Sequence, residues 1–143
     1  MILYIDMDRE ILSERDANNY SPLSLAFLGD SVYDMLVREH LLLEANMPVA
    51  KLHSAKIRLV CAEYQSAAYD LLSDRLEERE LAVLKRGRNA TGNTVPKHAE
   101  AAQYRRATAV ECLFGYLWLT GKDERIRELF KIIINENTVQ TGV

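Results

Sequence analysis

Two acidic residues stand within strongly apolar segments of the sequence, where a carboxylate needs a chemical reason. Asp30 lies in LSLAFLGDSVYDML, residues 23–36, whose apolar residues repeat at helical spacing and continue around the opposite side of the helix. Glu111 is the only residue between positions 109 and 119 that is neither apolar nor glycine. A helix that is apolar nearly all round is a buried helix. We therefore expect both carboxyl groups to be buried.

Burial of an isolated carboxylate is so costly that the group must find a partner or take up a proton. A divalent cation such as Mg²⁺ takes oxygen ligands and keeps several waters, so it would satisfy both Asp30 and Glu111. Alternatively, each acid forms a buried ion pair with a basic side chain. The residues alone leave the metal site and the ion pairs both open.

Basic residues are concentrated in one part of a chain whose net charge is −3. Residues 85–106 contain a single acid, Glu100, whereas the remainder of the chain is strongly acidic. The basic residues of this segment are Lys85, Arg86, Arg88, Lys97, Arg105 and Arg106. A basic patch on an acidic protein favours a polyanionic partner. The alternative is two solvated helix faces, with the residues at 85–88 complementing a helix dipole.

The composition is that of one ordinary globular domain. The chain has 143 residues, of which 48% are hydrophobic and 27% are charged, enough to bury a core. It contains no long apolar run and no basic-then-apolar leader, so we expect a cytoplasmic protein without a membrane partner. Cys61 and Cys112 lack the number and spacing of a zinc site or disulfide framework, so we expect two buried thiols.

The periodicity predicts an all-α fold of about five main helices. Ser21-Pro22 is a typical helix start, and Gly121 a typical stop. The expected helices cover residues 22–45, 48–73, 74–88, 99–120 and 123–135, and the segment 87–97 reads as a surface loop. Residues 1–19 show no sustained period, and we expect them to be a loose leader before a single domain at 20–143.

Three motifs resemble one family. FLGDSV at 27–32 resembles the signature of the ribonuclease III endonuclease domain. YRRATAVECLFGYLWLTG at 104–121 resembles the second carboxylate helix of that domain. KRGRNATGNTVPK at 85–97 resembles the basic loop of the short branch of the family, Mini-ribonuclease III. With all three motifs in the expected order, the resemblance covers about residues 20–135.

The resemblance implies which residues do the chemistry. Asp30 matches the catalytic, metal-binding aspartate and Glu111 the metal-binding glutamate, with Mg²⁺ as the cofactor and Mn²⁺ as a substitute. The full-length family has further acids where this chain has Leu23, Ala26 and Thr108. The short branch has similar losses, which imply fewer protein ligands and more water on the metal, whether one ion or two.

The resemblance also implies a function and partners. It predicts a homodimeric endoribonuclease that cleaves double-stranded RNA and trims the paired ends of precursor 23S ribosomal RNA, and it allows a large-subunit ribosomal protein as a partner. Because the five helices use nearly all of this sequence, we expect no double-stranded-RNA-binding domain. RNA would then be bound by Lys85, Arg86, Arg88, Asn89, Lys97, Arg105 and Arg106. Contacts of this kind recognise the shape and backbone of A-form RNA.

Two further expectations follow from this interpretation. Gly29 would keep side-chain bulk away from the approaching phosphate, and the dimer would form through the apolar face around Phe27 and Tyr33. The alternative to the enzyme is a non-catalytic double-stranded-RNA-binding protein that acts in ribosome assembly. The missing acids at positions 23, 26 and 108 favour this alternative, whereas retention of Asp30 and Glu111 disfavours it.

Overall fold

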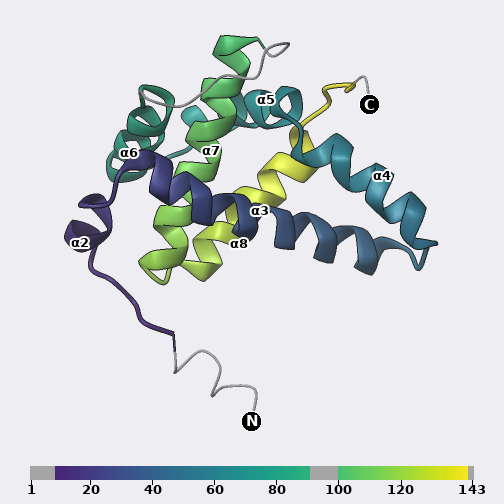
Figure 1. The fold of residues 1–143 in the computed structure, drawn as a ribbon, viewed down its shortest axis with the longest axis horizontal. Helices are drawn as coiled ribbons and strands as arrows, with labels where there is room; N and C mark the ends of the chain where they lie inside the picture. The colour runs from purple at the N-terminus through teal and green to yellow at the C-terminus, as the bar shows by residue number, and fades with distance from the viewer. Residues whose placement is uncertain (1–8, 91–99, 142–143) are drawn as a thin grey trace.

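The computed structural model describes residues 9–90 and 100–141, and within these residues it contains helices and no strand (Figure 1). The helices are α2 (Glu14–Asn18), α3 (Pro22–Glu44), α4 (Val49–Val60), α5 (Ala62–Ser73), α6 (Glu78–Arg88), α7 (Ala101–Leu119) and α8 (Asp123–Glu136). The all-α prediction is confirmed, although the described residues form more helices than the sequence predicted. None of these helices is long and apolar enough to span a membrane.

Helix α3 begins and ends where local signals place its ends. The Ser21 hydroxyl accepts a hydrogen bond from the Ser24 backbone N–H (3.1 Å), and Pro22 follows in the first turn. At the other end Ala45 is extended (φ −160°, ψ 140°). The predicted bounds of 22–45 therefore hold within a residue.

The predicted helix over 48–73 is wrong because the chain bends at Cys61. This residue is extended (φ −70°, ψ 159°), so α4 and α5 are separate helices. Helix α4 lies along the second half of α3, whereas α5 packs against α7 (Figure 1). The Tyr33 hydroxyl donates a hydrogen bond to the Leu59 carbonyl (2.7 Å), which satisfies one backbone acceptor near the end of α4. Cys61 is only partly buried, contrary to expectation, whereas Cys112 is buried as expected.

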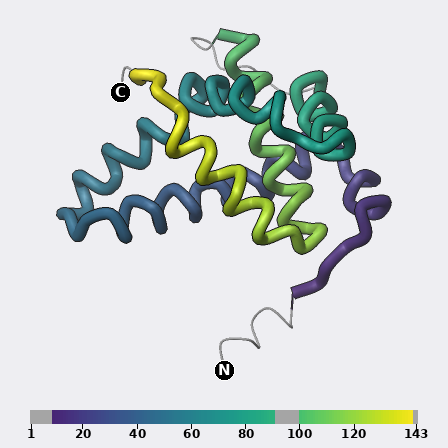
Figure 2. Tube along the Cα trace, turned by 180° about the vertical axis from the view of Figure 1, so that it is seen from behind, coloured from purple at the N-terminus to yellow at the C-terminus, as the bar shows by residue number. Residues whose placement is uncertain are grey.

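Helix α7 is the centre of the domain. It contacts α3, α5 and α6, and Figure 2 shows α8 crossing the back of the molecule, where it also contacts α5 and α7. All residues from Ala107 to Val110 and from Cys112 to Leu117 are buried. Within residues 107–117 of α7, Glu111 is thus the one residue that is only partly buried.

The crossing of α3 and α7 is a contact between backbones. A Cβ atom added at Gly29 would lie 1.6 Å from the Glu111 carbonyl oxygen, and one added at Gly115 would lie 1.9 Å from the Leu25 carbonyl oxygen. No side chain fits between the two helices here. Gly29 is buried, so its expected role beside an approaching phosphate is corrected: it permits close packing of the two helices that carry the acids.

Residues 9–19 are packed on the domain, although they lie in the segment expected to be a loose leader. The Leu12 N–H donates to the Leu119 carbonyl (2.8 Å), and Ala17 is fully buried. Arg9 forms an ion pair with Asp123 (2.7 Å), and its guanidinium carbon lies 3.7 Å from the centroid of the Trp118 ring. The expectation for residues 1–8 falls outside the described residues.

Candidate functional site

Asp30 lies on a solvent-exposed face of α3, so the prediction that this helix is buried all round is wrong. The core side of the helix is formed by residues such as Leu25 and Tyr33, which are 1% and 0% exposed. The opposite side carries large apolar residues that reach solvent, because Phe27 is 84% and Met35 is 47% exposed. Asp30 is therefore accessible to solvent, and an approaching ligand can reach it.

Glu111 comes from α7 and meets Asp30 at the crossing with α3. Burial, followed by the contact and the charge of Asp30, raises the pKa of Glu111 to about 8. No basic side chain is among the described groups that shift this pKa, so the buried ion pair considered for Glu111 is not what the structure shows. The structure brings the two sequence-predicted acids together as a carboxyl pair in which a second negative charge is unfavourable.

Gln65 of α5 is a third member of this cluster, and the sequence analysis missed it. The residue is 2% exposed, and its side chain lies against Glu111, where it partly offsets the rise in the pKa of that carboxyl. Its amide nitrogen is buried and has no hydrogen-bond partner among the described residues. The available signal was a glutamine within the apolar stripe of a predicted helix, which by itself indicates only a buried polar residue.

The carboxyl pair fits a hard divalent cation by its donor chemistry. Two carboxylates in contact repel each other, and a cation between them removes both this repulsion and the cost of burying Glu111. Asp30 is exposed, so water can complete the ligand shell. In the part of the chain that the structure describes, no group of three or more His, Cys, Asp or Glu residues could hold a metal ion. The protein would thus supply two carboxylates and the solvent the rest.

Thr108, one of the three positions where the full-length family has an acid, does not replace that acid. Its hydroxyl donates to the Tyr104 carbonyl within α7 (2.9 Å) and is 7% exposed. Ala26 is buried, and Leu23 is partly buried. None of the three side chains adds a charged oxygen to the site.

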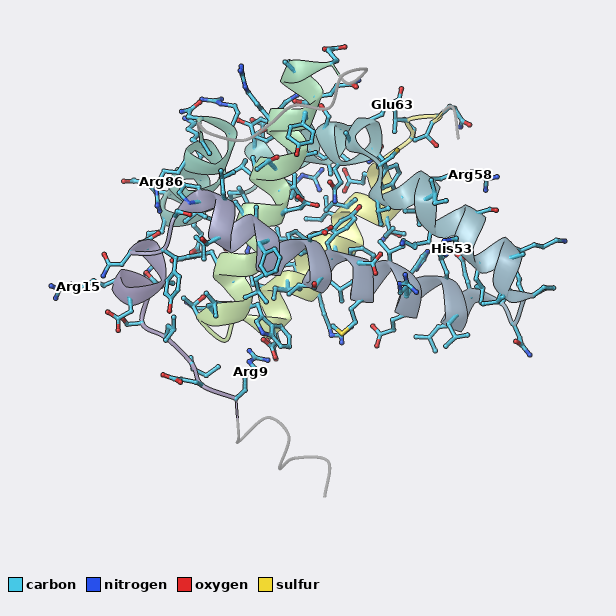
Figure 3. The ribbon with its side chains drawn as sticks, viewed as in Figure 1. Arg9, Arg15, His53, Arg58, Glu63 and Arg86 are labelled. Atoms are coloured by element: carbon cyan, nitrogen blue, oxygen red, sulfur yellow. The ribbon has the colours of Figure 1, made fainter. Side chains whose placement is uncertain are left out.

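Three of the predicted RNA-binding arginines are held by hydrogen bonds within the protein. Arg86 donates to the Asn18 side-chain oxygen (3.0 Å) and to the Tyr20 carbonyl (3.3 Å), and it lies beside the start of α3 (Figure 3). Arg88 donates to the Tyr69 hydroxyl (2.9 Å). Arg106 donates to the Ser66 hydroxyl (2.8 Å).

The other predicted RNA-binding residues are placed differently. Lys85 and Arg105 are exposed, as phosphate contacts require. Asn89 is exposed at the end of α6, where its side-chain oxygen accepts a hydrogen bond from Arg88 Nε (3.1 Å). Lys97 lies outside the described residues. The basic cluster therefore divides into exposed cations without a partner among the described residues, Lys85 and Arg105, and arginines that also hydrogen-bond within the protein.

Comparisons with known proteins show which proteins this chain is similar to. The family model described as Ribonuclease III domain matches residues 23–122. Mini-ribonuclease 3 of Brevibacillus brevis is 46% identical over 123 residues, which cover 86% of this chain and 91% of that protein. Mini-ribonuclease 3 of a Thermoanaerobacter species is 38% identical over 125 residues, covering 87% of this chain and 88% of that protein. A crystal structure of a protein from Fusobacterium nucleatum matches with a TM-score of 0.75 at 32% identity, covering 80% of this chain and 93% of that one.

Proposed function

The chain belongs to the ribonuclease III family of endoribonucleases, in its Mini-ribonuclease III branch, and we propose that it cleaves double-stranded RNA at a divalent-cation site formed by Asp30 and Glu111. The observation that carries this proposal is the contact between the two carboxyl groups, which come from different helices. One of them is exposed, and the other has a pKa raised to about 8. A carboxyl pair that reaches solvent and contains a group with a strongly raised pKa is typical of a functional site.

The two acids have different tasks in this proposal. A divalent cation bound here would act as a Lewis acid toward water and phosphate, with Mg²⁺ the expected ion and Mn²⁺ a substitute. Asp30, on the exposed face of α3, lies where a phosphodiester can approach from solvent. Glu111 is anchored in the most buried helix, so it fixes the position of the site relative to the core. Its deprotonation, which burial opposes, prepares the site to bind the cation.

Exposed lysine and arginine side chains would bind the phosphates of the RNA backbone. Lys85 and Arg105 are free to contact phosphates, whereas Arg86, Arg88 and Arg106 would contact RNA only by sharing or exchanging their present hydrogen bonds. Such contacts depend on salt and carry little sequence information. We expect recognition of duplex shape.

The exposed apolar face of α3 supports the proposal of a homodimer. Phe27, at 84% exposed, and Met35, at 47%, are large apolar side chains of α3 left in water, and exposed apolar surface of this kind is where we propose the interface. Tyr33, expected on the same face, is fully buried and belongs to the core instead. Light scattering at micromolar concentration should report about twice the 16.3 kDa chain mass.

The narrower proposals rest on the family resemblance. They are a cytoplasmic location, trimming of the paired ends of precursor 23S ribosomal RNA, and a large-subunit ribosomal protein as partner. Sequencing of the large-subunit RNA ends in cells that lack this protein tests the substrate. Unaltered ends would contradict it without affecting the chemistry proposed for the site.

Cleavage of a synthetic RNA duplex tests the function itself. The wild type should cut the duplex with Mg²⁺ and leave it intact with EDTA. Asp30→Asn and Glu111→Gln should each reduce single-turnover cleavage by several orders of magnitude, and the double variant should be scarcely worse, as expected for residues that act as a unit. A protein that shifts the mobility of the duplex in Mg²⁺ but never cuts it would instead be the non-catalytic RNA-binding protein, which the missing acids at 23, 26 and 108 favour.

A further inference from the structure

Gln65 has a position that neither core packing nor RNA binding explains. It is in the first turns of α5, between Tyr64 and Ser66, which are 5% and 4% exposed. The Ser66 hydroxyl accepts a hydrogen bond from Arg106, whereas the side chain of Gln65 lies against Glu111. An apolar side chain would fill the same buried space without the cost of desolvating an amide. We therefore expect the amide group of Gln65 to have a functional role.

The amide nitrogen of Gln65 is an unsatisfied hydrogen-bond donor. It is buried and has no hydrogen-bond partner among the described residues, although nearly all buried polar groups in folded proteins have one. The Gln65 side chain lies against the Glu111 carboxyl group, which is an acceptor when it is ionised. We infer that Gln65 is a positioning residue of the cation site, whose amide nitrogen donates to the Glu111 carboxylate and so holds that group in the orientation in which it can bind a cation together with Asp30. This inference rests on the proposed function.

A neutral donor suits this position better than the other residue types. An arginine or lysine would form a buried ion pair with Glu111 and compete with the cation for it. A third carboxylate would add repulsion, and an apolar residue would leave the carboxylate free to rotate. Hydrogen bonds to the groups that bind a metal typically orient them, and losing such a bond costs about 10–100-fold in metal affinity. An amide supplies this orientation without neutralising the ligand.

Replacement of Gln65 by methionine, which is similar in shape and unbranched, separates a positioning role from a packing role. The readout is Mn²⁺ affinity without RNA, followed by the electron paramagnetic resonance signal of the free ion, beside thermal melting without any divalent cation. Gln65→Met should weaken Mn²⁺ binding by about 10–100-fold. Its melting temperature without a divalent cation should stay the same or rise, because in that state the amide nitrogen that is removed has no hydrogen-bond partner among the described residues. Gln103→Met, the same change at a partly buried glutamine of α7, should leave Mn²⁺ affinity unchanged.

A shorter amide guards against a methionine variant that fails to fold. Gln65→Asn keeps the amide but withdraws it by one methylene, so it should also lose Mn²⁺ affinity. Wild-type affinity in either folded variant would overturn the inference. The wild type should bind Mn²⁺, and Asp30→Asn should abolish that binding. If the wild type does not bind Mn²⁺, or if Asp30→Asn binds it equally well, the proposed function is overturned, and the inference with it. The two failures are thus distinguished by the wild-type titration.

Discussion

Replacement of Gly29 by alanine should change the stability of the protein through two opposing effects. Helix propensity predicts a gain in stability, and the close contact between α3 and α7 predicts a loss. Alanine is favoured over glycine within a helix by roughly 0.5–1 kcal/mol, so propensity alone predicts a more stable protein. In the structure, however, the added Cβ would lie 1.6 Å from the Glu111 carbonyl oxygen and 2.7 Å from the Gly115 backbone nitrogen. Ordinary Cβ contacts begin near 3.4 Å. Helices α3 and α7 would have to separate by about 2 Å, in a core that tolerates little overpacking.

The expected cost follows from what obstructs the methyl group. Overpacking typically costs about 1–3 kcal/mol when neighbouring side chains can move. Here the obstacles are backbone atoms of the most buried helix, so we expect Gly29→Ala to lower the free energy of unfolding by at least about 3 kcal/mol, net of the propensity gain. Because Glu111 itself is displaced, the spacing of the two carboxyl groups changes too. A misplacement of about 1 Å can reduce a reaction rate on the order of 100-fold.

Urea unfolding without divalent cations and single-turnover cleavage of an RNA duplex measure the two effects. Gly87→Ala is the matched control, because its Cβ would meet Cys112 Cβ at 2.7 Å and Ala109 Cα at 2.9 Å, so the clash is smaller and does not involve the Glu111 backbone. It should lose less stability and a smaller share of its cleavage rate. A Gly29→Ala protein at least as stable as the wild type would refute the argument from backbone contact.

The remaining predictions concern the pH dependence of stability, the basic residues Lys85 and Arg86, and the contact of Arg9 with Trp118. Glu111, whose pKa is raised from 4.5 to about 8, keeps its proton in the folded protein where the unfolded chain has lost it, so the free energy of unfolding without cations should fall as pH rises from about 5 to 8. At about 1.4 kcal/mol per pKa unit the fall is on the order of 2–4 kcal/mol, and a flat profile in urea titrations would contradict it. Lys85→Ala should weaken duplex binding and flatten the slope of log affinity against log salt by about 0.7–0.9, whereas Arg86→Ala should also lower the melting temperature; equal melting temperatures would show that the hydrogen bonds of Arg86 contribute nothing. Arg9→Ala, which removes the contact with Trp118, should lower the free energy of unfolding by about 1–2 kcal/mol, and Arg9→Lys should recover only part of it, as measured in urea.

Helix ends were predictable wherever the signal is local. Ser21 and Pro22 define the start of α3, and Gly121, with its positive φ of 72°, follows the end of α7. The bend at Cys61 had no such signal, because neither glycine nor proline marks it. It is fixed by packing, since Tyr33, distant in sequence, bonds the Leu59 carbonyl. Contacts of this kind cannot be read from periodicity.

The exposure of Asp30 could not be predicted for a different reason. Periodicity identifies apolar residues, but it does not say whether they face the chain's own core or water. Phe27 and Met35 are as apolar as core residues and yet reach solvent. The wrong prediction that α3 is buried all round is therefore informative about function. Apolar residues left exposed beside Asp30 are what an interface near the proposed site would require.

The pairing of Asp30 with Glu111 depends on residues that carry no functional group. Helix axes usually lie 8–10 Å apart, at a distance set by the side chains at the contact, and side chains on Gly29 and Gly115 would have to fit into space that the opposite backbone occupies. Because Asp30 directly follows Gly29, its side chain projects beside the contact point and not into it. Glu111 lies one helical turn before Gly115, and its backbone is the surface that Gly29 touches. The two glycines thus bring the carboxyl groups within contact distance, and an alanine at either position would separate the acids that the proposed chemistry needs together.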